Sequence, residues 1–249
     1  MDRIGEGPPL LWLHGFTQTR SSAARFRSIL AERRTILTLD LPGHGEAAAL
    51  GGSLVEIADL VAGAVEEPVD LGGYSMGGRV ALHVALAHPQ TVRRLVVLGA
   101  TRGISDPIER RTRRERDHAL AQRVGRIGVE AFLTEWLAQP LFAGLPTDPL
   151  ERASRSRDAD GLARSLRDAG TGTQQWIGDR LAEVRAPTLA LAGQRDAKFS
   201  LEARAIGESV ANGRSDVVPD AGHAAHLEQP GATARLVEGF LAQDEDDDE

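Results

Sequence analysis

Val69-Asp70-Leu71-Gly72-Gly73-Tyr74-Ser75-Met76-Gly77-Gly78 is the stretch that decides the fold of this chain. It starts as a buried apolar strand over 69–73, turns sharply, and continues as a helix predicted from Met76 to His88, which Pro89 ends. The turn contains the pattern G-x-S-x-G, whose glycines leave room for a tight bend around Ser75. The pattern predicts a serine raised above a sheet at a helix N-terminus, where free backbone amides favour negative charge.

Short apolar runs alternate with helical patterns along the rest of the chain. Strands are predicted at 10–13, 36–39, 69–73, 95–98, 188–192 and 216–218. Further helices are predicted at 22–33, from a Ser53–Glu56 capping box through Val65, and at 231–242. Continuously apolar strands that alternate with helices indicate an α/β fold, with a mostly parallel sheet and helices on both faces.

Residues 101–185 interrupt this alternation, because they are charged, helical in pattern and without a strand. We predict that they form a helical cap inserted after the fourth strand of this chain, at the carboxyl ends of the strands, where open α/β sheets bind ligands. The core then comprises 1–100 and 186–243, and residues 244–249 are predicted to be an acidic disordered tail.

Composition excludes several classes of function. The chain of 249 residues carries a net charge of −7 and only 4% aromatic residues, which argues against a nucleic-acid partner. It has no cysteine, and therefore no disulfide or cysteine nucleophile, and no paired-histidine or phosphate-loop pattern suggests a metal or organic cofactor. Without a membrane-length apolar run or a signal-peptide pattern, we expect a cytoplasmic protein.

A reactive serine needs a base and an acid that orients the base. His223 follows the last predicted strand, and Asp196 follows the strand that ends at Gly193. The order serine, aspartate, histidine is typical of one large class of serine enzymes, so we predict Ser75, Asp196 and His223 as the catalytic residues. Asp220 is a rival for the acid, but its place in a turn favours a local hydrogen-bonding role.

The serine also needs two donors aimed at developing negative charge. We predict the backbone amides of Met76 and Phe16 as this oxyanion hole. His14 and His44, in the loops that follow the first two predicted strands, are interpreted as residues that organise those loops. The single lysine, Lys198, is expected to help hold the loop that carries Asp196.

These residues resemble the α/β-hydrolase superfamily over essentially the whole chain. Within it, the chain resembles the menaquinone-pathway 2-succinyl-6-hydroxy-2,4-cyclohexadiene-1-carboxylate (SHCHC) synthase family. The segments that carry this resemblance are Gly73–Arg79, Glu109–Arg114 with Asp117, Trp136–Phe142, Gly170–Gln174, and Asp196–Phe199 with His223 and His226–Pro230. Compared with the superfamily, the chain starts at the third strand, so we expect the leading strands to be missing or vestigial.

The resemblance implies a carbon–oxygen lyase that eliminates pyruvate from 2-succinyl-5-enolpyruvyl-6-hydroxy-3-cyclohexene-1-carboxylate and leaves a conjugated diene. Ser75 would act as a base, activated by His223. The polycarboxylate substrate would bind Arg79, Arg113, Tyr74 and Trp136, since arginine forks match carboxylates. A further family arginine falls at Arg155 or Arg157, and the shifted spacing leaves both open.

Two other functions fit parts of the same pattern. A serine carboxylesterase or thioesterase would keep the triad and would form an acyl-serine intermediate. A non-catalytic protein that binds an acidic metabolite would use only the cleft and the cap. We expect a monomer or homodimer with a small-molecule ligand, no nucleic acid and no membrane.

Overall fold

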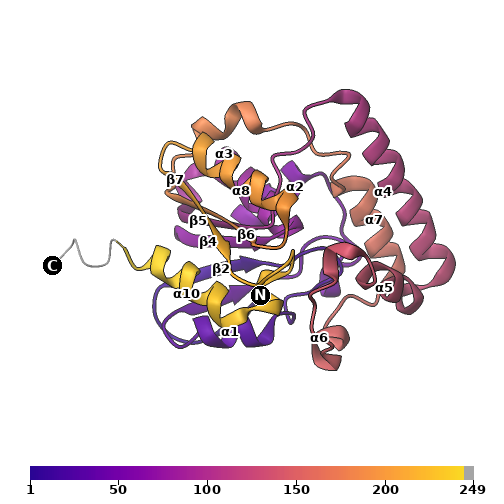
Figure 1. Ribbon diagram of the computed structural model, residues 1–249, viewed down its shortest axis with the longest axis horizontal. Helices are drawn as coiled ribbons and strands as arrows, with labels where there is room; N and C mark the ends of the chain where they lie inside the picture. Colours follow the sequence, from indigo (N-terminus) through magenta and orange to yellow (C-terminus); the bar gives the residue numbers. More distant parts are fainter. Residues whose placement is uncertain (244–249) are drawn as a thin grey trace.

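A computed structural model describes residues 1–243, and the predicted acidic tail at 244–249 lies outside the described residues. Its centre is one seven-stranded sheet in the order β1-β3-β2-β4-β5-β6-β7 (Figure 1). The strands are β1 (Asp2–Ile4), β2 (Pro9–Leu13), β3 (Thr35–Thr38), β4 (Val69–Tyr74), β5 (Val92–Leu98), β6 (Thr188–Gly193) and β7 (Gly213–Val218). Every pairing is parallel except that of β1 with β3. The predicted α/β fold is therefore confirmed.

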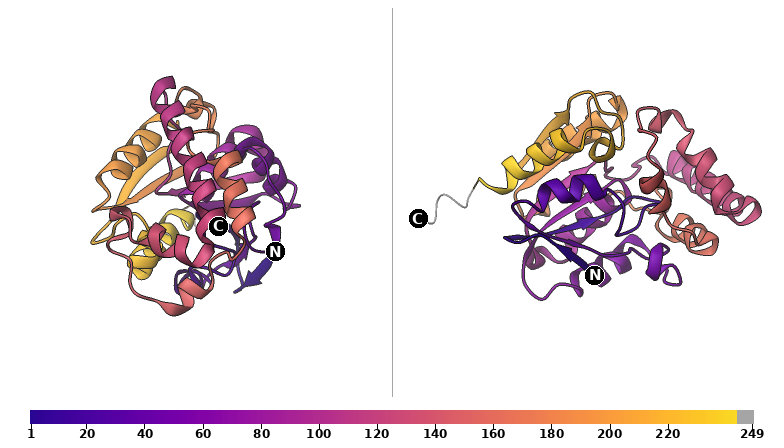
Figure 2. Two further views of the ribbon diagram at one scale, coloured as in Figure 1. Left: turned by 90° about the vertical axis from the view of Figure 1, so that its right-hand side faces the viewer. Right: turned by 90° about the horizontal axis from the view of Figure 1, so that it is seen from below.

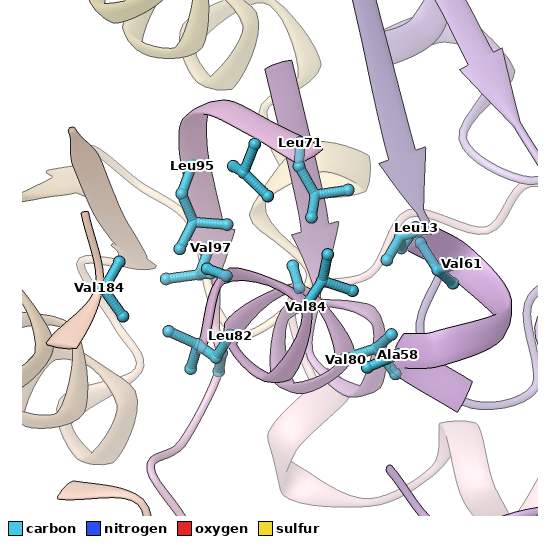
Figure 3. Packing of buried hydrophobic residues seen from close by; sticks show 14 of the residues in the cluster. Leu13, Ala58, Val61, Leu71, Val80, Leu82, Val84, Leu95, Val97 and Val184 are labelled. Atoms are coloured by element: carbon cyan, nitrogen blue, oxygen red, sulfur yellow. The ribbon is translucent and has the colours of Figure 1, made fainter. Parts of the chain in front are cut away.

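Helices cover both faces of the sheet. The helices α2 (Leu54–Ala62), α3 (Met76–Ala87) and α8 (Ala197–Ser209) pack on one face, and α1 (Ala24–Leu30) and α10 (Pro230–Leu241) pack on the other. Figure 3 shows Leu71 and Val97 of the sheet facing Leu82 and Val84 of α3. Burial of this apolar surface provides the main stabilisation of the layers.

The predicted capping box at the start of α2 is present. The Ser53 hydroxyl accepts a hydrogen bond from the Glu56 amide at 3.4 Å, and the Glu56 carboxylate accepts one from the Ser53 amide at 2.8 Å. The box fixes where the helix begins, because it satisfies amides that have no partner inside the helix.

Three sequence predictions need correction. No strand was predicted at 2–4, yet β1 forms there; it is short, partly exposed and at the sheet edge, so it has no apolar run to reveal it. The last strand, β7, begins at Gly213 and not at 216. The sequence did not show this start because residues 214–217 are exposed, at the other edge of the sheet, and form no apolar run. The first helix is confined to α1, shorter than the predicted 22–33.

The segment between β5 and β6 contains helices and no strand. It consists of α4 (Pro107–Ile127), α5 (Val129–Leu137), α6 (Pro149–Ala153), α7 (Ala159–Ala169) and the short 3₁₀ helices η3 (Pro140–Phe142) and η4 (Gly178–Glu183). The helices α4 to α7 stand together on one side of the sheet in Figure 1 and in the right-hand view of Figure 2. Because β1 exists, this segment follows the fifth strand and not the fourth.

The helical segment has a small core of its own. Val124 of α4, Phe132 of α5 and Leu162 of α7 are buried together there. Several arginines of α4, among them Arg111, Arg114 and Arg116, are exposed. Among residues 1–243, no helix combines the length and the apolar character needed to span a membrane.

A buried ion pair joins the sheet to the covering helices. Arg34, just before β3, donates to the Asp70 carboxylate of β4 at 3.0 Å and to the Glu238 carboxylate of α10 at 2.8 Å. The side chains of Arg34 and Asp70 are each only 1% exposed. Removing one partner of such a pair costs more than the pair contributes, because the other charge stays buried without compensation.

We therefore expect Asp70→Ala to lower the free energy of unfolding by about 3 kcal/mol, since it leaves the Arg34 guanidinium partly uncompensated. Urea denaturation followed by circular dichroism measures this loss. Ser53→Ala, which removes only a helix cap, serves as the comparison and should cost about 1 kcal/mol. An Asp70→Ala protein as stable as the Ser53→Ala protein would contradict this account of the ion pair.

Candidate active site

Ser75 lies at the sharp turn between β4 and α3. Its backbone has φ 51° and ψ −105°, a conformation that a residue with a side chain adopts only under strain. The turn needs glycine on both sides: a methyl group at Gly77 would overlap the Leu13 carbonyl, and one at Gly73 would overlap the backbone of Gly77. The glycine pattern in the sequence therefore has a steric cause.

Ser75, His223 and Asp196 form one hydrogen-bonded chain. The Nε2 atom of His223 lies 3.2 Å from the Ser75 hydroxyl, and Nδ1 lies 2.7 Å from an Asp196 carboxylate oxygen. Asp196 and His223 are both buried. The rival acid Asp220 is instead exposed and pairs with Arg195 at 2.9 Å.

Two loops place the acid and the base. Asp196 is the N-cap of α8 and accepts the Phe199 amide at 3.3 Å, while its other oxygen faces His223. The loop of His223 is held by Glu228, whose carboxylate accepts the amides of Gly222 at 2.7 Å and Ala224 at 3.2 Å. With Nδ1–H donated to Asp196, Nε2 can accept the serine proton, so the chain can generate a reactive serine oxygen.

The loop after β2 presents the amide of Phe16. On either side of it, the Gly15 amide donates to the Gln18 side chain at 2.9 Å and the Thr17 amide donates to His44 Nε2 at 3.2 Å. Among residues 1–243 the amide of Phe16 has no such partner. Met76 is the first residue of α3, so its amide has no carbonyl partner within the helix and is available to a ligand.

Two buried histidines hold this loop, as predicted for His14 and His44. His14 accepts the Leu41 amide through Nε2 at 3.0 Å, and its Nδ1 donates to the Gly15 carbonyl at 2.9 Å. Each ring can accept an amide hydrogen only while it is neutral. Burial favours that form, because it lowers the pKa of His14 to about 4 and the pKa of His44 to about 3.

A cavity of about 470 Å³ opens above the serine, between the sheet and the helical segment. Most of the residues predicted for the site line it, namely Phe16, Tyr74, Ser75, Met76, Arg79, Arg113, Trp136 and His223. Asp196 lies behind His223. Of the two arginines left open, Arg155 lines the cavity, whereas Arg157 is half exposed and pairs with Glu130.

Four arginines line this cavity, and three of them, Arg79, Arg113 and Arg155, are residues that the sequence had singled out. Arg79 follows Ser75 by one helical turn on α3, is 7% exposed, and donates to the Ala169 carbonyl at 2.9 Å. Burial, and then the nearby charge of Arg113, lower the pKa of Arg79 to about 10, so the group stays charged at neutral pH. Arg79 forms no ion pair with any carboxylate of the described residues.

The other two arginines are each held by a carboxylate. Arg113 of α4 donates to Asp117 at 2.8 Å, and the same aspartate accepts the Gly172 amide at 2.9 Å. Arg155 donates to the Thr17 hydroxyl at 2.6 Å and lies 3.5 Å from Glu151. Both guanidinium groups keep further N–H donors for a ligand.

Aromatic side chains form the apolar part of the wall. The ring of Trp136 lies 5.1 Å from that of Phe16, edge to face. Tyr74 is buried, its ring centroid lies 4.2 Å from that of His226 with the ring planes tilted by 43°, and burial raises the pKa of its hydroxyl. In the described chain, the Tyr74 hydroxyl has no hydrogen-bond partner, so it is available to bind a ligand in the cavity.

Sequence reasoning missed part of the lining. Trp176 faces the cavity with Arg102 stacked 5.0 Å from its ring centroid, and neither residue was predicted for the site. No motif in the sequence pointed to either residue. Within residues 1–243, no group of three or more histidine, aspartate or glutamate side chains is placed to hold a metal ion.

Comparison with known proteins agrees with this architecture. The model of the alpha/beta hydrolase family matches residues 10–236. A 2-succinyl-6-hydroxy-2,4-cyclohexadiene-1-carboxylate synthase of Serratia proteamaculans (strain 568) is 31% identical over 94% of this chain and 93% of its own length. A Bacillus subtilis (strain 168) protein, provisionally given the same name, is 35% identical over 95% of this chain and 92% of its own. The structure of MenH from S. aureus superposes with a TM-score of 0.91 at 28% identity, covering 98% of each chain.

The chain therefore belongs to the alpha/beta hydrolase family. Within that family, its similarity over nearly full length is to proteins named SHCHC synthase, as the resemblance predicted.

The buried histidines predict how stability depends on pH. In the unfolded chain a histidine takes up a proton near pH 6.5. In the folded chain the pKa of His14 is about 4 and that of His44 is about 3, so both rings stay neutral well below pH 6.5. The unfolded state therefore binds more protons below pH 6.5, and the free energy of unfolding should fall from there, by up to about 1.4 kcal/mol per pH unit for each group. Urea titrations between pH 7 and 5 test this.

Two variants isolate the contribution of His44 to this pH dependence of stability. His44→Gln should flatten the slope between pH 6.5 and 5, because the amide side chain can still accept from Thr17 but does not titrate. His118→Gln, at an exposed position on α4, should leave the slope unchanged. Equal slopes in wild type and His44→Gln would show that His44 is not held neutral by the fold.

Proposed function

We propose that this protein is an SHCHC synthase, a lyase that eliminates pyruvate from 2-succinyl-5-enolpyruvyl-6-hydroxy-3-cyclohexene-1-carboxylate in menaquinone biosynthesis. One observation carries the proposal: Arg79, Arg113 and Arg155 line the same cavity as Ser75 and His223. A substrate with three carboxylates needs several fixed cations around its reacting carbon. An esterase acting on a simple ester has no need of them.

The hydrogen-bonded chain supplies the base. His223 Nε2 takes the Ser75 proton, Asp196 stabilises the resulting imidazolium, and the serine oxygen removes a proton from the substrate ring. As that C–H bond breaks, a new C=C bond forms in the ring, the existing C=C bond shifts by one position, and the C–O bond to the enolpyruvyl group breaks. The leaving enolate becomes pyruvate by taking up the proton held on His223, which restores the neutral base, and a conjugated diene remains. No water is consumed and no acyl-serine forms.

The remaining residues of the cavity stabilise developing charge and position the substrate. Negative charge grows on the substrate during elimination, and the amides of Phe16 and Met76 are donors that could receive it. Arg79 lies one turn from the serine and has no carboxylate partner of its own among the described residues, so we assign it to a substrate carboxylate close to the reacting carbon. Trp136 and Tyr74 would hold the ring, and the helical segment would act as a cap that excludes water.

We also expect the protein to work in the cytoplasm, as a monomer or homodimer, on a small polycarboxylate and without a cofactor. These expectations rest on composition and on the chemistry proposed for the site.

The proposed activity is tested by adding the enolpyruvyl precursor and following pyruvate release and diene absorbance together. Equal amounts of both products, formed far faster than in the Ser75→Ala protein, are expected. Burst turnover of a p-nitrophenyl ester without action on the precursor would assign the protein to the hydrolases. Tight binding of the precursor without turnover of either compound would indicate a metabolite-binding protein.

Removing the serine hydroxyl should abolish most of the activity. Ser75→Ala and His223→Ala should each lower kcat by about 10³-fold or more, and the double variant should lose little beyond that, because the residues act as one unit. Steady-state kinetics on the precursor, with circular dichroism to verify folding, measure this. Near-normal kcat in Ser75→Ala would refute a serine base.

Arg79→Gln should lower kcat/KM by about 100-fold, since it removes a desolvated carboxylate contact. Arg157→Gln is the matched control, because Arg157 is a helical-segment arginine outside the cavity lining, and should stay within about twofold of wild type. If the two variants behave alike, Arg79 is not part of the substrate site.

A further inference from the structure

The proposed function leaves two cationic residues of the cavity wall, Arg102 and Lys198, without a role. Five cationic side chains line the cavity: Arg79, Arg102, Arg113, Arg155 and Lys198. Three of them are compensated by carboxylates: Arg102 lies 3.3 Å from Glu202, Arg113 lies 2.8 Å from Asp117, and Arg155 lies 3.5 Å from Glu151. Within residues 1–243, Arg79 and Lys198 form no such ion pair.

Lys198 differs from Arg79 in position. It is exposed and belongs to the first turn of α8, two residues after Asp196. Its ammonium lies 5.5 Å from the ring centroid of Phe199, and that ring packs 4.4 Å from the ring of His223. Lys198 is therefore at the rim of the cavity, on the wall formed by the acid and base residues, whereas Arg79 is buried beside the serine.

The structure does not support a purely structural role for Lys198. The sequence suggested that it holds the loop of Asp196, but in the described chain it donates no hydrogen bond to that loop. Asp196 is held instead by the Phe199 amide and by His223. Lys198 is also the one lysine among 29 basic residues, and an ammonium on a flexible stem can follow a carboxylate that moves into a site.

We propose that Lys198 binds a carboxylate of the substrate at the mouth of the cavity, across the reacting centre from the carboxylate held by Arg79. This subsite rests on the proposed function, and it explains how one cavity holds a polyanionic substrate at two separated ends. Glu109 of α4 also lines the cavity and forms no ion pair among the described residues, so an anion is disfavoured directly beside it. The ligand class is a dicarboxylate or tricarboxylate.

Kinetics on the enolpyruvyl precursor test the subsite. Lys198→Gln should lower kcat/KM by about tenfold with kcat nearly unchanged. It should also make kcat/KM less sensitive to salt concentration, because a charge at the rim acts mainly on the rate of substrate binding. Lys198→Arg should restore most of the loss. Arg204→Gln, the same charge change at an exposed position of α8 outside the cavity lining, should stay within about twofold. Equal behaviour of Lys198→Gln and Arg204→Gln would overturn the subsite.

A second measurement does not depend on the lyase activity. The single lysine can be acetylated with a neutral N-hydroxysuccinimide ester, and mass spectrometry compares its rate with that of the Met1 amine. Succinate should slow acetylation at Lys198 at least threefold but not at Met1, and neutral succinamide at the same ionic strength should have no effect. Equal rates with succinate and succinamide would refute the subsite. Protection by succinate in a protein that does not act on the precursor would refute only the proposed reaction.

Discussion

The contact between the first turn of α3 and the end of β2 is the constraint on which the rest of the site depends. Gly77 lies so close to the Leu13 carbonyl that no side chain fits between them. This closeness forces Ser75 into its strained conformation and brings two backbone segments together, one carrying the amide of Met76 and the other the loop of Phe16. A helix placed further from the sheet would relax the turn and would separate Ser75 from the loop of Phe16.

The loop of Phe16 is held from two directions. From the core, His44 accepts the amide of Thr17, whose φ is 70°. From the helical segment, Arg155 donates to the Thr17 hydroxyl at 2.6 Å and the Ser156 amide donates to the Thr17 carbonyl at 2.8 Å. The conformation of the loop is therefore determined jointly by the sheet and by the helices above it. This shared anchoring couples the donor geometry to the part of the chain that closes the cavity.

Charge is distributed unevenly around the cavity. Arg113 is compensated by Asp117 and is thereby oriented, while Arg79 and Lys198 have no carboxylate partner in the described chain. A buried cation without a counter-ion is costly unless a ligand compensates it. The arrangement therefore favours an anionic ligand near the serine, which is the feature that separates the proposed lyase from an esterase with the same triad.

The sequence by itself determined the strand–turn–helix at Ser75 and the α/β class, and it pointed to Asp196 and His223 as the hydrogen-bonded partners of Ser75, because these depend on local patterns and chain order. It did not reveal β1 or the start of β7, whose exposed edges carry no apolar run. Only the tertiary structure decided that Arg155 lines the cavity and Arg157 does not. Both arginines lie in the short loop between α6 and α7, where the direction of a side chain depends on what packs around it, and no spacing rule contains that information.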